Sequence, residues 1–236
     1  MARNSYFQFK QFRVEQGQTA MKITTDACIL GARAEVENTQ SILDIGAGTG
    51  LLSLMAAQRS HATIDAVELD DQAATQALEN FTASPWSSRL ALHHCSIQSF
   101  MPEKRYDCIL SNPPFFENAF KAPCDKRSLA RHTDSLSFLE LAINIDRLMS
   151  EDGKAWILLP VESSPLFLEA IHQATQLKLK RTIAVRSSAH HRDHRHILVL
   201  GRPDSEHFRE QITIYDQHPE YTSETIGFLK PYYLKL

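Results

Sequence analysis

Short apolar runs and longer amphipathic stretches alternate along most of the chain. The short runs are rich in β-branched and other apolar side chains, which predicts buried strands. The stretches between them repeat apolar positions at helical spacing, which predicts helices packed on a sheet. This alternation favours an α/β fold. Strands are expected at residues 41–45, 63–67, 90–94, 106–110 and 155–159, and helices at 27–34, 51–58, 72–81, 135–149 and 164–175.

The N-terminal end departs from this alternation. Residues 6–23 interleave aromatic and polar positions around Gly17, which predicts a small hairpin ahead of the main domain. Its rings either pack on the domain or, because cations stand between them, stack on bases. We expect a hairpin extension at residues 1–24 and one main domain at residues 25–236.

The C-terminal third predicts antiparallel strands. Residues 177–186 and 196–201 are strand-like on either side of a connection rich in His and Arg at 190–195, and a further short strand is expected at 212–215. Alternating His and Arg in a strand connection gives no support for a closed metal site. No metal is expected, and a solvated or RNA-facing loop is the preferred interpretation.

Composition and charge limit the possible functions. With 236 residues, 43% hydrophobic and 22% charged, the chain fits one soluble domain with appendages. The net charge of −3 gives no global basic field, so contact with nucleic acid must come from local patches. The four cysteines are scattered without a C-x-x-C pair, and there is no signal-peptide pattern and no apolar run of bilayer length. We therefore expect a cytoplasmic protein without disulfides and without a membrane segment.

A glycine turn follows the first predicted strand. Asp44 and Ile45 end that strand, and Gly46-Ala47-Gly48-Thr49-Gly50 leads into an apolar helix. Such a strand–turn–helix unit lets the backbone approach a ligand at a helix N-terminus. The spacing is G-x-G-x-G and not the dinucleotide pattern G-x-G-x-x-G, which weakens a nicotinamide or flavin interpretation. The carboxylate of Asp44 would repel phosphate, so it favours a cofactor that presents a cation.

Two polar residues follow the next two strands. Glu68 ends the second strand roughly 20 residues past the glycines, where a carboxylate can accept hydrogen bonds from both hydroxyls of a ribose. Ser96 comes just after the third strand, where an adenine ring could be flanked. Ordinary polarity at a strand end is the alternative for both residues.

A stiff bend follows the fourth strand. It is Asn112-Pro113-Pro114-Phe115, in which two consecutive prolines can extend neither a strand nor a helix. The bend places an amide and an aromatic ring at the carboxyl edge of the sheet, where open α/β sheets bind ligands. A structural Asn in a proline-rich turn is the alternative to a catalytic role.

Local clusters of cations are the candidates for contact with RNA. The polar stretch at 116–134 carries several, and the stretch at 178–202 has seven Lys and Arg residues against one acidic residue. The N-terminal hairpin adds cations between its rings. The candidate RNA-binding residues are Lys10, Arg13, Lys121, Lys126, Arg127, Arg131, His132, Arg192 and Arg195.

Together these motifs resemble those of a known enzyme family. Residues 44–50 with Glu68 are similar to the cofactor-binding motif of class I S-adenosylmethionine-dependent methyltransferases, and residues 112–115 to the catalytic motif of those that methylate exocyclic or amide nitrogens. Blocks over almost the full length resemble the bacterial tRNA1(Val) (adenine-37-N6)-methyltransferase family. These blocks include Phe9-Lys10-Gln11-Phe12, Ala20-Met21-Lys22, Thr25-Asp26, Ser84-Pro85-Trp86, Ala130 to Leu136 and Tyr232-Tyr233-Leu234-Lys235.

The resemblance implies a Rossmann-like α/β fold with a seven-stranded methyltransferase sheet, mostly parallel with an antiparallel C-terminal strand. It implies S-adenosyl-L-methionine as cofactor, a tRNA as substrate and N6-methyladenine beside the anticodon as product, and a monomer is expected. The cofactor would be held by Asp44, Gly46, Gly48, Gly50, Glu68, Ser96 and Asn112, and the target base by Asn112, Pro113, Pro114 and Phe115.

The chain departs from the family pattern at two places. Phe115 stands where that family usually has Tyr, which keeps a stacking ring. Cys95-Ser96 stands where an acidic residue often follows the third strand, which leaves the adenine contact open. Three rival functions also stay open: a guanine-N2 methyltransferase of ribosomal RNA, a protein glutamine-amide methyltransferase, and a cofactor-binding RNA chaperone without catalysis.

Overall fold

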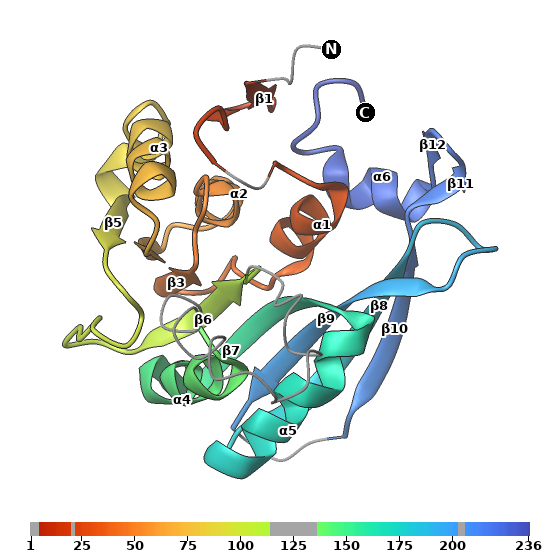
Figure 1. Ribbon diagram of the computed structural model, residues 1–236. Helices are drawn as coiled ribbons and strands as arrows, with labels where there is room; N and C mark the ends of the chain where they lie inside the picture. The colour runs from red at the N-terminus through yellow and green to blue at the C-terminus, as the bar shows by residue number, and fades with distance from the viewer. Residues whose placement is uncertain (1–4, 20–21, 114–135, 203–205) are drawn as a thin grey trace, which may run out of the picture.

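The computed structural model describes residues 5–19, 22–113, 136–202 and 206–236 (Figure 1). The α-helices of this part of the chain are α1 Thr25–Arg33, α2 Leu51–Arg59, α3 Asp71–Thr82, α4 Phe138–Leu148, α5 Ser164–Ala174 and α6 Ser223–Leu229, with short 3-10 helices at Ser87–Arg89 and Val161–Ser163. The strands are β1 Tyr6–Gln8, β2 Arg13–Glu15, β3 Ser41–Ile45, β4 Thr63–Glu68, β5 Leu90–His94, β6 Tyr106–Ser111, β7 Met149–Pro160, β8 Lys178–Arg186, β9 Asp193–Gly201, β10 Phe208–Thr213, β11 Tyr215–Gln217 and β12 Glu220–Tyr221.

The main sheet of the described residues has eight strands in the order β10-β8-β9-β7-β6-β3-β4-β5. The strands from β5 to β7 in this order are parallel to their neighbours. β9 runs antiparallel to both β7 and β8. The expected Rossmann-like α/β fold, mostly parallel with an antiparallel C-terminal strand, is confirmed. In addition to the seven expected strands, β10 joins the edge of the sheet beside β8.

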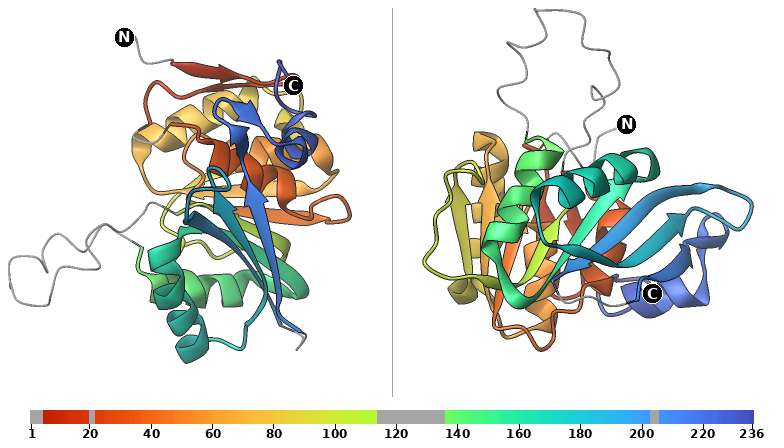
Figure 2. Two further views of the ribbon diagram at one scale, coloured as in Figure 1. Left: turned by 90° about the vertical axis from the view of Figure 1, so that its right-hand side faces the viewer. Right: turned by 90° about the horizontal axis from the view of Figure 1, so that it is seen from below.

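Helices cover both faces of this sheet (Figures 1 and 2). α4 and α5 lie on one face, where Leu141 and Phe167 are part of the core. α1, α2 and α6 lie on the other face, where Leu30 and Trp156 are buried. Because both faces are covered, the central strands are continuous apolar runs rather than alternating ones. None of the helices in the described ranges is long and apolar enough to cross a membrane.

Two elements begin away from their predicted positions for local reasons. α4 begins later than expected because Ser137 caps it. The Ser137 hydroxyl accepts a hydrogen bond from the Glu140 N–H, and the Glu140 carboxylate accepts one from the Ser137 N–H at 2.8 Å. β7 begins at Met149, well before the predicted start at 155. Residues 150–154 are polar or Gly, and in this half only Met149 and Lys154 pair with β6, so hydrophobicity alone does not reveal this part of the strand.

The C-terminal strands also differ from the expected bounds. β9 begins at Asp193, so residues 193–195 lie in the strand and not in the connection before it. The short strand expected at 212–215 is divided, because its first two residues end β10 and Tyr215 begins β11.

The N-terminal hairpin of β1 and β2 packs into the domain. Phe9 and Phe12 are 0% and 4% exposed, in one core with Leu54 and Tyr232. The Lys10 N–H donates to the Tyr232 carbonyl at 2.7 Å, so the hairpin also contacts the C-terminal tail. These two rings are therefore not available to stack on bases, and the packing alternative is correct for them.

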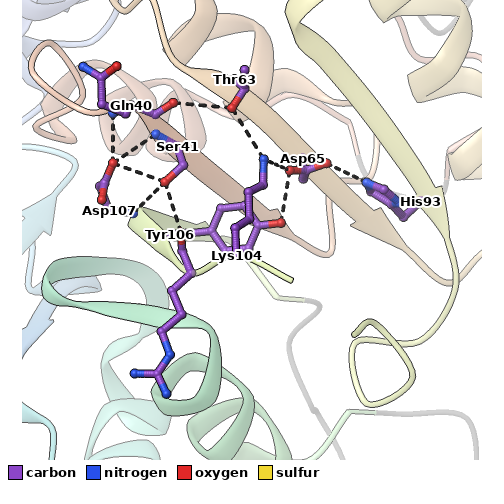
Figure 3. A network of polar contacts seen from close by, with 9 residues as sticks. Gln40, Ser41, Thr63, Asp65, His93, Lys104, Tyr106 and Asp107 are labelled. Carbon is purple, nitrogen blue, oxygen red and sulfur yellow. Dashed lines mark hydrogen bonds and ion pairs between the residues drawn. The ribbon is translucent and has the colours of Figure 1, made fainter. Parts of the chain in front are cut away.

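A polar network anchors the connection between β5 and β6, which crosses the sheet without a helix of its own (Figure 3). The Asp65 carboxylate on β4 lies 2.6 Å from His93 Nε2 and 2.7 Å from Lys104 Nζ. It also accepts a hydrogen bond from the Tyr106 hydroxyl at 3.1 Å. These contacts hold the end of the connection and the start of β6 against β4 and β5.

Candidate active site

The glycine turn lies at the carboxyl edge of the sheet, between β3 and α2. Its glycines have positive φ angles, 72° at Gly46, 57° at Gly48 and 78° at Gly50, in the region that glycine adopts readily. A Cβ atom at Gly46 or Gly48 would meet nothing within 4 Å, so the surface over these residues is open. A Cβ at Gly50 would lie 2.4 Å from the Phe81 ring. The first two glycines thus leave room for a ligand, and the third permits packing on α3.

The Asp44 carboxyl group is fully buried at the end of β3. Its Oδ2 accepts hydrogen bonds from the N–H and the hydroxyl of Ser53, at 3.1 and 2.8 Å. Its Oδ1 has no hydrogen-bond partner among the described residues. Burial raises the pKa of Asp44 to about 7, although the hydrogen bonds from Ser53 act to lower it. A buried carboxyl oxygen without a partner fits a ligand that brings donors or a positive charge.

The Glu68 carboxylate lies against the same turn. Its Oε2 accepts a hydrogen bond from the Gly48 N–H at 2.7 Å, and its Oε1 accepts two from the N–H groups that follow Glu68, at 2.8 and 2.9 Å. Ser96 follows β5, the strand beside β4, and its hydroxyl donates to Ser99 Oγ at 3.0 Å. The structure brings Glu68 into direct contact with the glycine turn and leaves Ser96 past the end of the adjoining strand.

Asn112 follows β6 at this edge of the sheet. The preceding residue, Ser111, donates from its hydroxyl to the Ile45 carbonyl at 2.8 Å, which ties the end of β6 to the end of β3. The Asn112 Oδ1 is buried and has no hydrogen-bond partner within the described part of the chain. Pro113, which follows it, is buried. A fixed amide oxygen without a partner can accept a hydrogen bond from a bound substrate.

Two serines that hold these groups are not singled out by motif analysis. Ser53 interrupts the apolar face of α2, and Ser111 ends the apolar run of β6. Both are fully buried. The signal that marks them is a hydroxyl inside an otherwise apolar segment, because a buried hydroxyl must find a hydrogen-bond partner.

Part of the candidate site lies outside the described residues. Pro114 and Phe115 of the bend belong to this group. The candidate cations of the stretch after the bend do so too, and they are Lys121, Lys126, Arg127, Arg131 and His132.

The candidate cations of the N-terminal hairpin contact neighbouring groups of the protein. Lys10 Nζ donates to the carbonyl groups of Lys230 and Leu236, at 2.5 and 3.2 Å. Arg13 forms an ion pair with Glu15 at 2.5 Å and lies over the ring of Tyr6. Both side chains therefore have intramolecular partners that an RNA phosphate would have to replace or share.

The other two candidates lie where β8 turns into β9. Arg192 is exposed in the connection, and Arg195 is the third residue of β9, with its Nε 3.9 Å from an Asp26 carboxylate oxygen. β9 is antiparallel, so its first residues lie at the carboxyl edge of the parallel strands, with Arg195 opposite Pro160 at the end of β7. In the described ranges no group of three or more His, Cys, Asp or Glu side chains is arranged to hold a metal ion.

The basic stretch at 178–202 is partly neutralised by acidic residues from distant segments. Arg181 pairs with Glu35 and Glu210, each at 3.2 Å. Arg202 pairs with Asp146 at 2.5 Å. The sequence from 178 to 202 therefore has a larger excess of cations than the folded protein has on its surface there.

The known proteins that this chain resembles are methyltransferases. The family model "Methyltransferase small domain" matches residues 22–128. A curated tRNA1(Val) (adenine(37)-N6)-methyltransferase of Dyadobacter fermentans is 52% identical over 185 residues, which are 78% of this chain and 77% of that protein. A protein of the same name from Cytophaga hutchinsonii is 41% identical over 239 residues, which cover 99% of each chain.

A solved structure supports the fold. A predicted O-methyltransferase from Agrobacterium tumefaciens has a TM-score of 0.69 at 13% sequence identity, and the match covers 87% of this chain and 96% of that chain. At this identity the likeness shows the fold alone, whereas the sequence relatives share enough identity, over enough of their length, to show the family. The chain belongs to the tRNA1(Val) (adenine(37)-N6)-methyltransferase family.

Proposed function

We propose that this methyltransferase modifies N6 of adenine 37, beside the anticodon of tRNA1(Val). The curated relatives are named for this activity. The structural observation that carries the proposal is the buried Oδ1 of Asn112, which has no hydrogen-bond partner among the described residues. Asn112 directly follows β6, the strand next to β3, which leads into the open glycine turn. An acceptor in this place suits an exocyclic amine, which is a hydrogen-bond donor.

The cofactor is S-adenosyl-L-methionine, and the residues at the sheet edge fit it. The Asp44 Oδ1, which has no hydrogen-bond partner among the described residues, suits its cationic end, and the open glycines leave room for it. The Glu68 Oε2, which accepts one hydrogen bond from the Gly48 N–H, can accept another from a ribose hydroxyl. The residues that we propose to hold it are Asp44, Gly46, Gly48, Gly50, Glu68, Ser96 and Asn112. When bound, the cofactor supplies an electrophilic methyl group on a sulfonium, which requires no metal.

The bend after β6 orients the amine. The lone pair of the adenine amine is delocalised into the ring, so the amine is a poor nucleophile. Asn112 Oδ1 accepts one of its N–H bonds and the main-chain carbonyl of Pro113 or Pro114 accepts the other, which turns the lone pair outwards as the nitrogen pyramidalises. The protein thus contributes positioning and support for the developing positive charge, and not a strong base. Phe115 stacks on the base.

The tRNA must present this base outside its own stack. A base in a folded RNA loop has to be splayed out before it can enter such a pocket. We propose that the cations after the bend, those of the β8–β9 connection and those of the N-terminal hairpin hold the RNA backbone. The enzyme would act in the cytoplasm as a monomer.

Methyl transfer to total tRNA from cells that lack this enzyme tests the proposal. Labelled methyl groups are expected in one nucleoside, N6-methyladenosine, and mass mapping of the digested product is expected to place it at position 37 of tRNA1(Val). Asn112→Ala protein controls for a contaminating methyltransferase. Label in N2-methylguanosine when ribosomal RNA is supplied, or in protein when cell protein is supplied, with none in tRNA, would replace this proposal with one of its rivals.

A further inference from the structure

Asn80 on α3 links the N-terminal hairpin to the glycine turn. Its Nδ2 donates to the Glu15 carbonyl and to the Thr49 carbonyl, each at 2.9 Å. Its Oδ1 accepts a hydrogen bond from the Glu15 N–H at 2.8 Å. Asn80 is 2% exposed. Both amide hydrogens and the amide oxygen are therefore used, inside the protein, to join two segments that are far apart in the sequence.

The hydrogen bond from Asn80 to the Thr49 carbonyl lies in a part of the turn where the backbone has positive φ angles on both sides. Thr49 stands between Gly48 and Gly50, which both have positive φ, and Gly50 is the N-cap of α2. The hydrogen bond from Asn80 fixes the direction of the Thr49 carbonyl. The next residue of α3, Phe81, packs against Gly50, where a Cβ would lie 2.4 Å from its ring. Two consecutive residues of α3 thus hold this half of the turn.

We infer that Asn80 is a positioning residue of the cofactor site and that, through it, the hairpin is a structural part of that site. Gly48, beside Thr49, donates its N–H to the Glu68 carboxylate at 2.7 Å. A displaced Thr49 carbonyl would disturb this contact as well as the open surface over Gly48. The inference rests on the proposed function in one respect, because it takes the glycine turn as the surface that binds the cofactor.

Gln76, one helical turn before Asn80, provides a matched control. Its Oε1 accepts a hydrogen bond from the Gln18 N–H at 3.3 Å, and its Nε2 donates to Glu79 at 2.7 Å. Like Asn80 it is buried, but it fastens the segment after β2 to α3, whereas Asn80 fastens the end of β2 itself. Replacement of Gln76 therefore loosens the hairpin segment without removing the bond from Asn80 to the glycine turn.

Calorimetric titration of the full-length protein with S-adenosyl-L-methionine tests the inference without RNA. Asn80→Ala and Asn80→Asp are expected to raise the Kd about tenfold or more, whereas Gln76→Ala stays within about twofold of wild type. Asn80→Asp keeps the acceptor for the Glu15 N–H, loses both donated bonds and sets a carboxyl oxygen against the two carbonyls, so its Kd should rise at least as much as that of Asn80→Ala. Urea unfolding of every variant separates loss of affinity from loss of folding, and Asn80→Ser is the substitute if neither variant folds.

Two further measurements distinguish positioning from general stability. Hydrogen exchange of the Gly48 and Gly50 amides in the unbound protein is expected to be faster in Asn80→Ala than in Gln76→Ala. At saturating cofactor, kcat for tRNA should stay within about threefold of wild type, because Asn80 touches no reacting group.

The outcomes separate this inference from the proposed function. Equal Kd values for wild type and the Asn80 variants, in a wild-type protein that binds the cofactor, would overturn the inference alone. A wild-type protein that binds the cofactor but transfers no methyl group to tRNA would overturn the proposed function and leave the inference about cofactor binding in place.

Discussion

The protonation state of the Asp44 carboxyl group couples the proposed cofactor site to pH. Burial raises its pKa to about 7 from the ordinary 3.8, so below that pH the group is mostly protonated in the unbound protein. The stability that the raised pKa contributes is present at low pH and is lost as the pH rises through about 7. A cationic ligand favours the carboxylate, so binding below this pH must release a proton.

The affinity for S-adenosyl-L-methionine is therefore expected to rise with pH, by at most about tenfold per pH unit, until the pH reaches about 7. Above that pH the affinity should stay constant. Calorimetric titration with the cofactor at pH 6, repeated in buffers of different ionisation enthalpy, should show that close to one proton is released for each cofactor bound. Asp44→Asn should bind more weakly, with a nearly flat pH profile. Binding at pH 6 without proton release by the wild type would contradict this account of Asp44.

Asn112→Ala is expected to weaken cofactor binding by only a few-fold, because the other six proposed cofactor-binding residues remain. It is expected to lower methyl transfer by about 10² or more, because the acceptor that orients the amine is gone. Single-turnover assays with tRNA, beside calorimetry with the cofactor alone, measure the two effects. Ser111→Ala is the graded control, since it removes only the bond that fixes the end of β6 to Ile45. Turnover of Asn112→Ala at the wild-type rate would remove Asn112 from the mechanism.

At the residue scale, the sequence indicates which groups meet but not how they are held. Parallel strands place their carboxyl ends at one edge, so the convergence of the glycine turn, Glu68 and Asn112 follows from the order of the elements. The bond from Gly48 to Glu68 and the support of Asp44 by Ser53 depend on individual atoms. No spacing rule contains that information.

At the element scale, the network around Asp65 ties the end of the β5–β6 connection to β4 and β5 (Figure 3). Burial alone would raise the pKa of Asp65, but hydrogen bonds from Lys104 and His93 outweigh it and lower the pKa below the ordinary value. A carboxyl pKa that is lowered in the folded state stabilises the fold at every pH above the ordinary pKa near 4. This contribution is lost as the pH falls through the lowered pKa.

Asp65→Asn is expected to lower the free energy of unfolding by about 1–2 kcal/mol at pH 7, a figure reduced for the partly exposed Lys104. The difference from wild type should persist down to about pH 5 and shrink below pH 4. Urea unfolding across this range measures it. Tyr106→Phe removes one bond to the same carboxylate and should cost less. A difference that grows towards low pH would contradict the assigned role of Asp65.

Among the elements, those defined by apolar periodicity could be predicted and those defined by polar contacts could not. β3, β4 and β6 are buried apolar runs, and their predicted bounds agree with the structure to within a residue. Residues 150–154 of β7 are polar or Gly, and this half of the strand is paired with β6 only at Met149 and Lys154, on either side of a register shift. The start of α4 is set by the Ser137 cap rather than by apolar spacing.

At the scale of the whole molecule, the charge that RNA meets depends on tertiary ion pairs. Glu35, before β3, lies between Lys154 and Arg181 of two later strands. Hydrogen bonds from Lys154 and Arg181 lower the pKa of Glu35 despite the opposing effect of its burial, so it is a carboxylate at neutral pH. Such pairings join residues more than a hundred positions apart, and a count of charges along the sequence cannot anticipate them.

Cations that are paired with carboxylates inside the protein and cations that are exposed should affect the salt dependence of tRNA binding differently. Arg192 is exposed, so Arg192→Ala should weaken binding and reduce the slope of log K against log salt concentration by about one. Arg202 is held by Asp146 at 2.5 Å, so Arg202→Gln should lower stability by about 1–3 kcal/mol and leave the slope unchanged. Filter binding over a range of potassium chloride concentrations, with thermal unfolding of both variants, measures the two effects. Equal losses of slope would show that Arg202 exchanges its carboxylate partner for a phosphate when RNA binds, and would refute the distinction between paired and available cations.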